Sequence, residues 1–379
     1  MELAAQESPG IRVKGNPDIL DVLCGALRGD DIAWPLASDK AFYSELLGQA
    51  VHHGVDCLFW HALQERHERR QLPDWLKEEL SARTTRAVAV EMVRANDVRS
   101  LQQQLTQAGI TAILMKGGAL AYTHYPEPYL RARADTDIFI APRDIKVIRD
   151  VFQAAGYRLE GWIYKSHQFK ALRDGFGGQT IKYDVHWRSS NQSRYARVLS
   201  HDDARENSVT IEQLGGIAAL SAGFALIQAC IHRAAGTYHD PNRLVWLYDV
   251  HLLVHGMGEP ELNRFAERAV EAGVQDICLE AFRRAERLFG TELPVPLLQA
   301  MKEPAAQAVL PGGSGKFSLI VDDLREMPDA RGRLDLLSEY LWPPADYLLQ
   351  RYGKTGAYWV PVLYVRYLFS GIFERLSPG

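Results

Sequence analysis

The period of the hydrophobic pattern changes twice along this chain, and these changes constrain its fold more than any other feature. Residues 16–108 repeat apolar side chains at helical spacing, and the helical pattern returns from Gly215 onward. Between these regions, short apolar runs bounded by glycine and proline alternate with helical stretches. The layout predicts an α+β fold in which a small mixed β-sheet core, at 109–214, is flanked by N- and C-terminal helical subdomains at 16–108 and 215–379. Residues 1–15 are predicted to be a disordered N-terminus.

Within the core, four short segments have the length and composition of strands. They are "ITAILM" (110–115), "DTDIFI" (135–140), "YRLEGWI" (157–163) and "QTIKYDVHW" (179–187). Two helices are predicted between them, at 118–125 and 143–156, because each is followed by proline or ends in glycine. The sequence "IAALSAGFALIQACIHRAA" (217–235) is predicted to be a single helix.

Composition and charge argue against several classes of protein. The net charge of the 379 residues is -4, so no global basic field indicates nucleic acid. The four cysteines are far apart in the sequence, which argues against a zinc ribbon or a disulfide framework and fits a reducing, cytoplasmic location. The N-terminus shows no apolar segment of a secretory signal. The apolar stretches at 216–231 and 355–369 are too short or too interrupted for a membrane span, so no membrane partner is expected.

Two aspartates one residue apart, Asp135 and Asp137, belong to the predicted strand "DTDIFI". Residues at this spacing point to the same face of a strand, so their carboxylates lie side by side and need a cation to neutralise them. Mg²⁺, or Mn²⁺, suits such oxygen ligands and leaves positions open for phosphates. Asp184 lies in the next clear strand. The three aspartates are therefore predicted to be the metal ligands and catalytic residues of two-metal phosphoryl transfer.

The segment "ILMKGGAL" (113–120) leads from a predicted strand into a helix through Gly117 and Gly118. Backbone N–H groups at such a helix N-terminus bind phosphate, and glycine lets the phosphate approach closely. Lys116 adds a mobile positive charge. These three residues are predicted to hold the phosphates of a bound nucleotide.

Together these motifs resemble the polymerase-β-type nucleotidyltransferase superfamily. The stretch "LMKGGALAYTHYPEPYLRARADTDIFIAPRD" (114–144) is similar to the family catalogued as uncharacterised nucleotidyltransferases, which has Leu-Lys-Gly, Tyr-Pro and then Arg-x-x-x-Asp-x-Asp. Arg131 matches the arginine of that pattern. "YDVHW" (183–187) is similar to the family's later Asp-x-His segment, and "CIHRAAGTYHDPNRLVWLYDVHLLV" (230–254) to its helical stretch. The resemblance covers about residues 20–375.

The resemblance implies that residues 109–214 form a nucleotidyltransferase α/β core. Such a core transfers a nucleoside monophosphate from an NTP to an acceptor and releases pyrophosphate, with ATP as the expected nucleotide and AMP as the expected group. Asp135 and Asp137 are expected to bridge two Mg²⁺ ions, and Asp184 to complete the metal that activates the acceptor.

The resemblance also gives roles to residues outside the acidic motif. Arg131 is expected to offset negative charge in the transition state. His232 and Arg243, in the helical stretch, are expected to line the pocket for the nucleotide or the acceptor. One position departs from the wider superfamily, which usually has Gly-Ser after the first glycine: Ala119 follows Gly118, so no hydroxyl is available.

Several questions stay open at the level of sequence. The acceptor is a small molecule, a modified peptide or a protein side chain, whereas RNA is conceivable but not favoured. A toxin-type nucleotidyltransferase acting on tRNA is the alternative enzyme, and a nucleotide-binding module without turnover is the alternative from another class. His186 either orients a metal ligand or is merely a polar residue on the same face as Asp184. "PGGSGKFS" (311–318) fails the P-loop pattern and is predicted to be a mobile loop.

Overall fold

A computed structural model describes residues 17–302 apart from 67, 161–166, 176–177, 191–194 and 236–241. Beyond these it describes isolated positions and short stretches between residues 324 and 367. The N-terminus predicted to be disordered and the predicted loop at 311–318 both lie outside the described residues. No helix in the described part of the chain is both long enough and apolar enough to cross a membrane.

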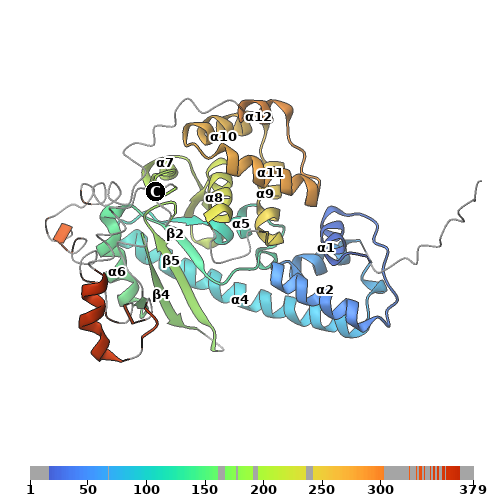
Figure 1. The fold of residues 1–379 in the computed structure, drawn as a ribbon, viewed down its shortest axis with the longest axis horizontal. Coiled ribbons are helices and arrows are strands. Elements are labelled where there is room, and N and C mark those ends of the chain that lie inside the picture. The colour runs from blue at the N-terminus through green and yellow to red at the C-terminus, as the bar shows by residue number, and fades with distance from the viewer. Residues whose placement is uncertain are drawn as a thin grey trace, which may run out of the picture.

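In the described part of the chain, four α-helices precede the sheet. They are α1 (Ile19–Arg28), α2 (Lys40–His53), α3 (Asp56–Glu65) and α4 (Asp74–Gln107). The Asp18 carboxylate caps α1 by accepting hydrogen bonds from two backbone N–H groups, and Gly29 ends this helix in the left-handed conformation. With 34 residues, α4 runs from beneath the other N-terminal helices to the sheet (Figure 1). Helical spacing and capping residues therefore predicted this region correctly.

The described strands form one seven-stranded mixed sheet in the order β3-β4-β5-β2-β1-β7-β6. Its members are β1 (Ile113–Met115), β2 (Thr136–Phe139), β3 (Arg158–Glu160), β4 (Gln168–Asp174), β5 (Thr180–His186), β6 (Ser208–Ile211) and β7 (Ile217–Leu220). β2 and β5 are parallel, as are β1 and β7, and the other neighbouring pairs are antiparallel. The predicted α+β fold, with a small mixed sheet flanked by helices, is confirmed.

Two layers of helices cover the sheet. One face packs against α4 and α6 (Ile145–Ala154), since Ile138 and Tyr183 of the central strands share a buried cluster with Val98 of α4. The other face lies toward α5 (Lys116–Thr123), α8 (Ala222–Ala235) and α9 (Leu244–Gly256) (Figure 1). Because side chains alternate along a strand, Asp137 and Asp184 point away from the first core and toward these three helices.

The remaining helices are α7 (His201–Glu206), α10 (Glu259–Glu271), α11 (Gln275–Phe289) and α12 (Val295–Ala300). One apolar cluster includes Leu23 of α1 and Phe282 of α11, so helices that precede the sheet in the sequence share a core with helices that follow it. The Arg28 guanidinium donates a hydrogen bond of 2.5 Å to the carbonyl of Leu288 at the same contact. We therefore propose that the N- and C-terminal helical regions form one helical body around the sheet.

The prediction of a single helix over 217–235 is wrong for its first residues. Ile217–Leu220 form β7, which pairs in parallel with β1, and α8 begins only at Ala222. Four apolar residues are too few to show a period, so the pairing with β1 decides their conformation. β4 and β6 were likewise not predicted as strands. Since β7 belongs to the sheet, we propose that the core extends to Leu220 rather than to residue 214.

Candidate active site

The parallel pairing of β2 with β5 places two predicted ligands side by side. Asp137 lies directly opposite Asp184 in the register of these strands, and Phe139 lies opposite His186. Residues opposite one another on adjacent strands project on the same side of a sheet. The expectation that Asp184 comes from a strand beside the Asp-x-Asp motif therefore agrees with the register. Asp135 lies one residue before β2, in a bend.

This pair belongs to a group of side chains with the composition of a metal site. Asp137, Asp184 and His186 each offer one ligand atom, and these atoms lie within 4.8 Å of one another. The Nε2 atom of His186 is 2.9 Å from Oδ1 of Asp137. These three side chains lie close enough together to hold one metal ion, and no other such group of His, Cys, Asp or Glu side chains is found among the described residues. Asp135 is not a member of it.

Lys116 reaches the same donor atoms. Its Nζ donates a hydrogen bond of 2.6 Å to Oδ1 of Asp137 and lies 3.5 Å from Nε2 of His186. The backbone of Lys116 has a φ of 52°, in the left-handed region that residues other than glycine rarely adopt. Such conformations cost free energy and are typical of functional sites. The turn between β1 and α5 thus holds the lysine ammonium against the carboxylate.

A cavity of about 640 Å³ lies over this face of the sheet. It brings together all nine residues that the sequence predicted as site residues: Lys116, Gly117, Gly118, Arg131, Asp135, Asp137, Asp184, His232 and Arg243. The sheet and the start of α5 supply the charged side of the cavity, and α8 and α9 supply the opposite wall. Residues separated by more than a hundred positions in the sequence therefore meet in a single cavity.

Burial and mutual repulsion perturb the ionisation of the acids. Burial raises the pKa of Asp135, and the neighbouring Asp137 and Asp184 carboxylates raise it further. Burial and the Asp137 carboxylate likewise raise the pKa of Asp184. Burial also opposes ionisation of Asp137, but the Lys116 ammonium and the hydrogen bond with His186 outweigh it and hold its pKa below the ordinary value. One anion is thus stabilised at the centre, with two carboxylates beside it that ionise less readily.

Gly117 makes room for a side chain of the protein itself. A Cβ atom at this position would lie 2.9 Å from Cζ of Arg131. The Arg131 guanidinium is buried and donates from Nε and Nη2 to the two oxygens of Asp249, at 2.7 and 2.6 Å. Asp249 also accepts a hydrogen bond from the hydroxyl of Tyr125 at 2.8 Å. The close approach at Gly117, expected for a phosphate, is here made by a guanidinium whose charge Asp249 already balances.

Asp249 is a residue whose partner the sequence did not reveal. Arg243, in the same helical stretch, is the arginine nearest to it in the sequence. The structure instead joins α9 to the segment before β2 through Arg131 and Asp249, across 118 positions of sequence. Both are nearly fully buried, at 7% and 5% side-chain exposure, so neither charge is balanced by water. In the sequence, Glu127 and Asp135 each lie four positions from Arg131, so nothing there indicated a partner on α9.

Aromatic rings form the wall opposite the carboxylates. Trp246 of α9 meets His232 of α8 edge to face, with ring centroids 4.9 Å apart. The Arg243 guanidinium lies over Trp246 at 5.4 Å and donates a hydrogen bond from Nε to the carbonyl of His52. Burial, together with the Lys116 ammonium, lowers the pKa of His232 to about 3. His232 is therefore a neutral ring on the aromatic wall of the cavity, next to the charged side that the sheet and the start of α5 supply.

One cavity-lining side chain of α8 has an orphaned acceptor. Gln228 is buried, its Nε2 donates to the carbonyl of Ser189 at 3.0 Å, and its Oε1 has no partner. Ala119, in contrast, is buried in the cluster on the other face of the sheet.

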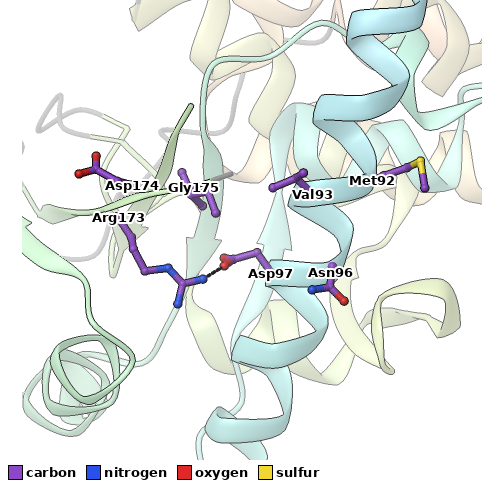
Figure 2. A pocket seen from close by; sticks show the side chains of 8 residues that line it. Met92, Val93, Asn96, Asp97, Arg173, Asp174 and Gly175 are labelled. Atoms are coloured by element: carbon purple, nitrogen blue, oxygen red, sulfur yellow. Dashed lines mark hydrogen bonds and ion pairs between the residues drawn. The ribbon is translucent and has the colours of Figure 1, made fainter. Parts of the chain in front are cut away.

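A second cavity, of about 460 Å³, lies between α4 and the β4–β5 hairpin. Figure 2 shows Arg173 of β4 reaching Asp97 of α4 across it. Asp97 also accepts hydrogen bonds from the hydroxyls of Tyr157 and Tyr183. Because three donors balance this one buried carboxylate, the arrangement is that of a packing contact between helix and sheet rather than of a site.

The geometry agrees with what comparison with known proteins shows. A family model described as an uncharacterised nucleotidyltransferase matches residues 40–290, about two thirds of the chain. The chain belongs to this family of nucleotidyltransferases. A crystal structure of an antigenic nucleotidyltransferase-like protein from Paracoccidioides brasiliensis is similar at 16% identity and a TM-score of 0.37, over 56% of this chain and 93% of that one. None of the proteins with a curated description matches this chain.

Proposed function

We propose that this protein transfers a nucleoside monophosphate from an NTP, with ATP as the expected donor, to an acceptor and releases pyrophosphate. The observation that carries the proposal is the register of β2 and β5, which sets Asp137 beside Asp184 in a cavity that also holds the glycine turn. Membership of a nucleotidyltransferase family supports the reaction class. Attack by an acceptor on the α-phosphate requires charge stabilisation along the triphosphate and a base for the acceptor.

The donor set fits a divalent cation. Asp135, Asp137 and Asp184 offer carboxylate oxygens, the ligands that Mg²⁺ and Mn²⁺ prefer, and an ammonium already contacts the central carboxylate. When bound, such ions lower the pKa of an attacking hydroxyl and neutralise developing charge on the phosphates. The elevated pKa values of Asp135 and Asp184 agree with a site whose negative charge is in excess of the fixed positive charge.

The chain's own residues have separable tasks in this proposal. Gly117 and Gly118 line the cavity at the start of α5, where backbone N–H groups are available to the phosphates. Lys116 supplies a positive charge beside Asp137. We propose that Arg131 acts as a positioning residue, since Asp249 binds both of its parallel N–H donors and thereby fixes the segment before Asp135. The wall formed by His232 and Trp246 is suited to the apolar surface of a nucleobase.

A single assay tests the reaction class. Pyrophosphate release would be measured with each of the four NTPs and Mg²⁺ or Mn²⁺, in parallel with labelling of protein and cell extract by α-labelled NTP. The expected result is metal-dependent release that is lost in Asp184→Asn and kept in Asp150→Asn, a control at an exposed position. Nucleotide binding without release, in the presence of extract as acceptor source, would instead support a binding module without turnover.

A further inference from the structure

We propose that His186 is itself a metal ligand, and that the first divalent cation is held by Asp137, Asp184 and His186 rather than by the Asp-x-Asp pair alone. This inference rests on the proposed function and specifies its metal site. It assigns the nitrogen ligand to Nε2 of His186, and it leaves Asp135 for a cation that arrives with the nucleotide.

The backbone fixes the three donors in one place. Asp184 and His186 are two residues apart on β5 and so project on the same face, while Asp137 lies opposite Asp184 on the parallel neighbour β2. Their ligand atoms lie within 4.8 Å of one another, with Nε2 of His186 2.9 Å from Oδ1 of Asp137. Two paired strands thus hold all three side chains. Sites built on strands are positioned more precisely than sites built on loops.

Asp135 differs from these three in its support. It precedes β2, lies in a bend, and keeps partial exposure, whereas Asp137 and His186 are 7% and 5% exposed. Its carboxylate is not part of the compact group. A cation bound without nucleotide would therefore find its ligands among the strand residues first.

The Lys116 ammonium marks where a cation is favourable. Its Nζ lies 2.6 Å from Oδ1 of Asp137 and 3.5 Å from Nε2 of His186, so a positive group already contacts two of the three donor atoms. The position of Nζ is thus one at which a cation lies beside both Asp137 and His186. The rival role is a donor: an Nε2–H group that orients Asp137 and does not bind metal.

The two roles differ in the metal that they favour. Imidazole nitrogen favours transition-metal ions such as Mn²⁺, Co²⁺ and Zn²⁺, whereas Mg²⁺ prefers oxygen ligands throughout. A site of two carboxylates and one imidazole is expected to bind Mn²⁺ more tightly than Mg²⁺. Removing the imidazole is expected to weaken Mn²⁺ binding by about tenfold or more, the effect typical of losing a ligand or its immediate support, and to change Mg²⁺ binding less.

The decisive measurement is pulsed electron paramagnetic resonance of the wild-type protein with Mn²⁺ and no nucleotide. A ¹⁴N coupling from a directly bound imidazole is expected. It should persist in Asp135→Asn and in His232→Gln, a histidine of the same cavity outside the group, and disappear in His186→Gln together with the loss of Mn²⁺ affinity. Bound Mn²⁺ without ¹⁴N coupling in the wild type would overturn the inference without requiring any variant to fold.

The same samples separate this inference from the proposed function. Pyrophosphate release by a protein whose Mn²⁺ shows no nitrogen coupling would leave the function standing and return His186 to an orienting role. Loss of Mn²⁺ binding in Asp135→Asn but not in His186→Gln would also overturn the ligand assignment. Failure to bind Mn²⁺ with or without NTP would contradict both proposals.

Discussion

Two buried aspartates of this molecule, Asp97 and Asp137, have opposite surroundings. Asp97 of α4 is matched by three donors from the sheet, the hydroxyls of Tyr157 and Tyr183 and the guanidinium of Arg173 (Figure 2). Asp137 of β2 has Lys116 and His186 as partners, but two more carboxylates lie beside it in the same cavity. The first acid is fully satisfied by the protein, whereas the second belongs to a group with unbalanced charge.

This difference shows how a buried carboxylate that stabilises the fold can be told from one that serves a functional site. A carboxylate with a full set of donors ties two elements together, and removing it leaves those donors without a partner. A group of carboxylates that repel one another destabilises the fold unless a ligand neutralises it. Asp97 should therefore matter for stability and Asp137 for chemistry, and each prediction below tests one side of that contrast.

The largest expected effect is on turnover. Asp137→Asn should reduce pyrophosphate release on the order of 10³-fold, because it removes the central charge of the group, while the loss of its contacts with Lys116 and His186 should lower the free energy of unfolding without unfolding the protein. Steady-state rates and urea titrations on the same samples check both parts. Asp150→Asn, a substitution at an exposed position of α6, is the control. A stability loss large enough to explain the lost rate would contradict the separation.

The complementary change is expected to act on stability. Asp97→Asn should lower the free energy of unfolding by about 3 kcal/mol, since it leaves the Arg173 charge and two buried hydroxyls poorly matched. The kcat of the folded fraction should stay within about twofold of the wild type. Chemical denaturation measures the first quantity, with Asp174→Asn, exposed beside the same cavity, as the matched control. Equal losses in both variants would show that Asp97 has no special role.

A third prediction concerns pH and a buried histidine outside the group. Burial lowers the pKa of His167 to about 4, so it stays neutral in the folded protein while the unfolded chain takes up a proton near its ordinary value. The neutral, buried ring therefore costs no stability at pH values above 6.5, the ordinary pKa of histidine. As the pH falls from there toward 4, the unfolded chain binds a proton that the folded protein does not, so the free energy of unfolding falls. Between pH 7 and pH 5 we expect a loss of about 2 kcal/mol in the free energy of unfolding from this residue. Denaturation at the two pH values should show a smaller difference in His167→Gln, and an unchanged difference would refute the assignment.

The smallest expected effect returns to the charge balance of the site. Lys116→Gln should raise the affinity for Mg²⁺ in the absence of nucleotide on the order of tenfold, because it removes a positive charge 2.6 Å from a ligand oxygen. Calorimetric titration measures this, with the exposed Lys146→Gln as control. Weaker Mg²⁺ binding in Lys116→Gln would mean that the lysine supports the metal site rather than opposing it.

Local signals in the sequence were enough to predict much of the fold and to single out several residues that line the cavity. Asp-x-Asp, the glycine turn and the apolar runs at 110–115 and 135–140 each depend on neighbouring residues only. Asp137 lies beside Asp184 because the strand at 135–140 pairs with the predicted strand at 179–187. The ends of α1 likewise depend on neighbouring residues, since Asp18 caps its start and Gly29 ends it.

What the sequence did not reveal depends on distant partners. Ile217–Leu220 become a strand because β1 offers an edge for parallel pairing, and nothing in those four residues distinguishes a strand from the start of α8. The partner of Arg131 lies 118 positions away on α9. The contact of 2.9 Å between Nε2 of His186 and Oδ1 of Asp137 depends on the actual distance between the two strands. Contacts between residues this far apart in the sequence leave no periodic pattern of side chains from which they could be predicted.

The salt bridge between Arg131 and Asp249 has a consequence for the order in which the protein matures during translation. The chain leaves the ribosome from its N-terminus, so the β2 segment with Asp135 and Asp137 appears long before α9. Until then Arg131 has no acid to offset the cost of its burial, and the helix that provides Trp246 is missing. A nascent chain cannot complete the cavity before roughly the first 250 residues have emerged, so the wall supplied by α9 is added only after the strands of the sheet.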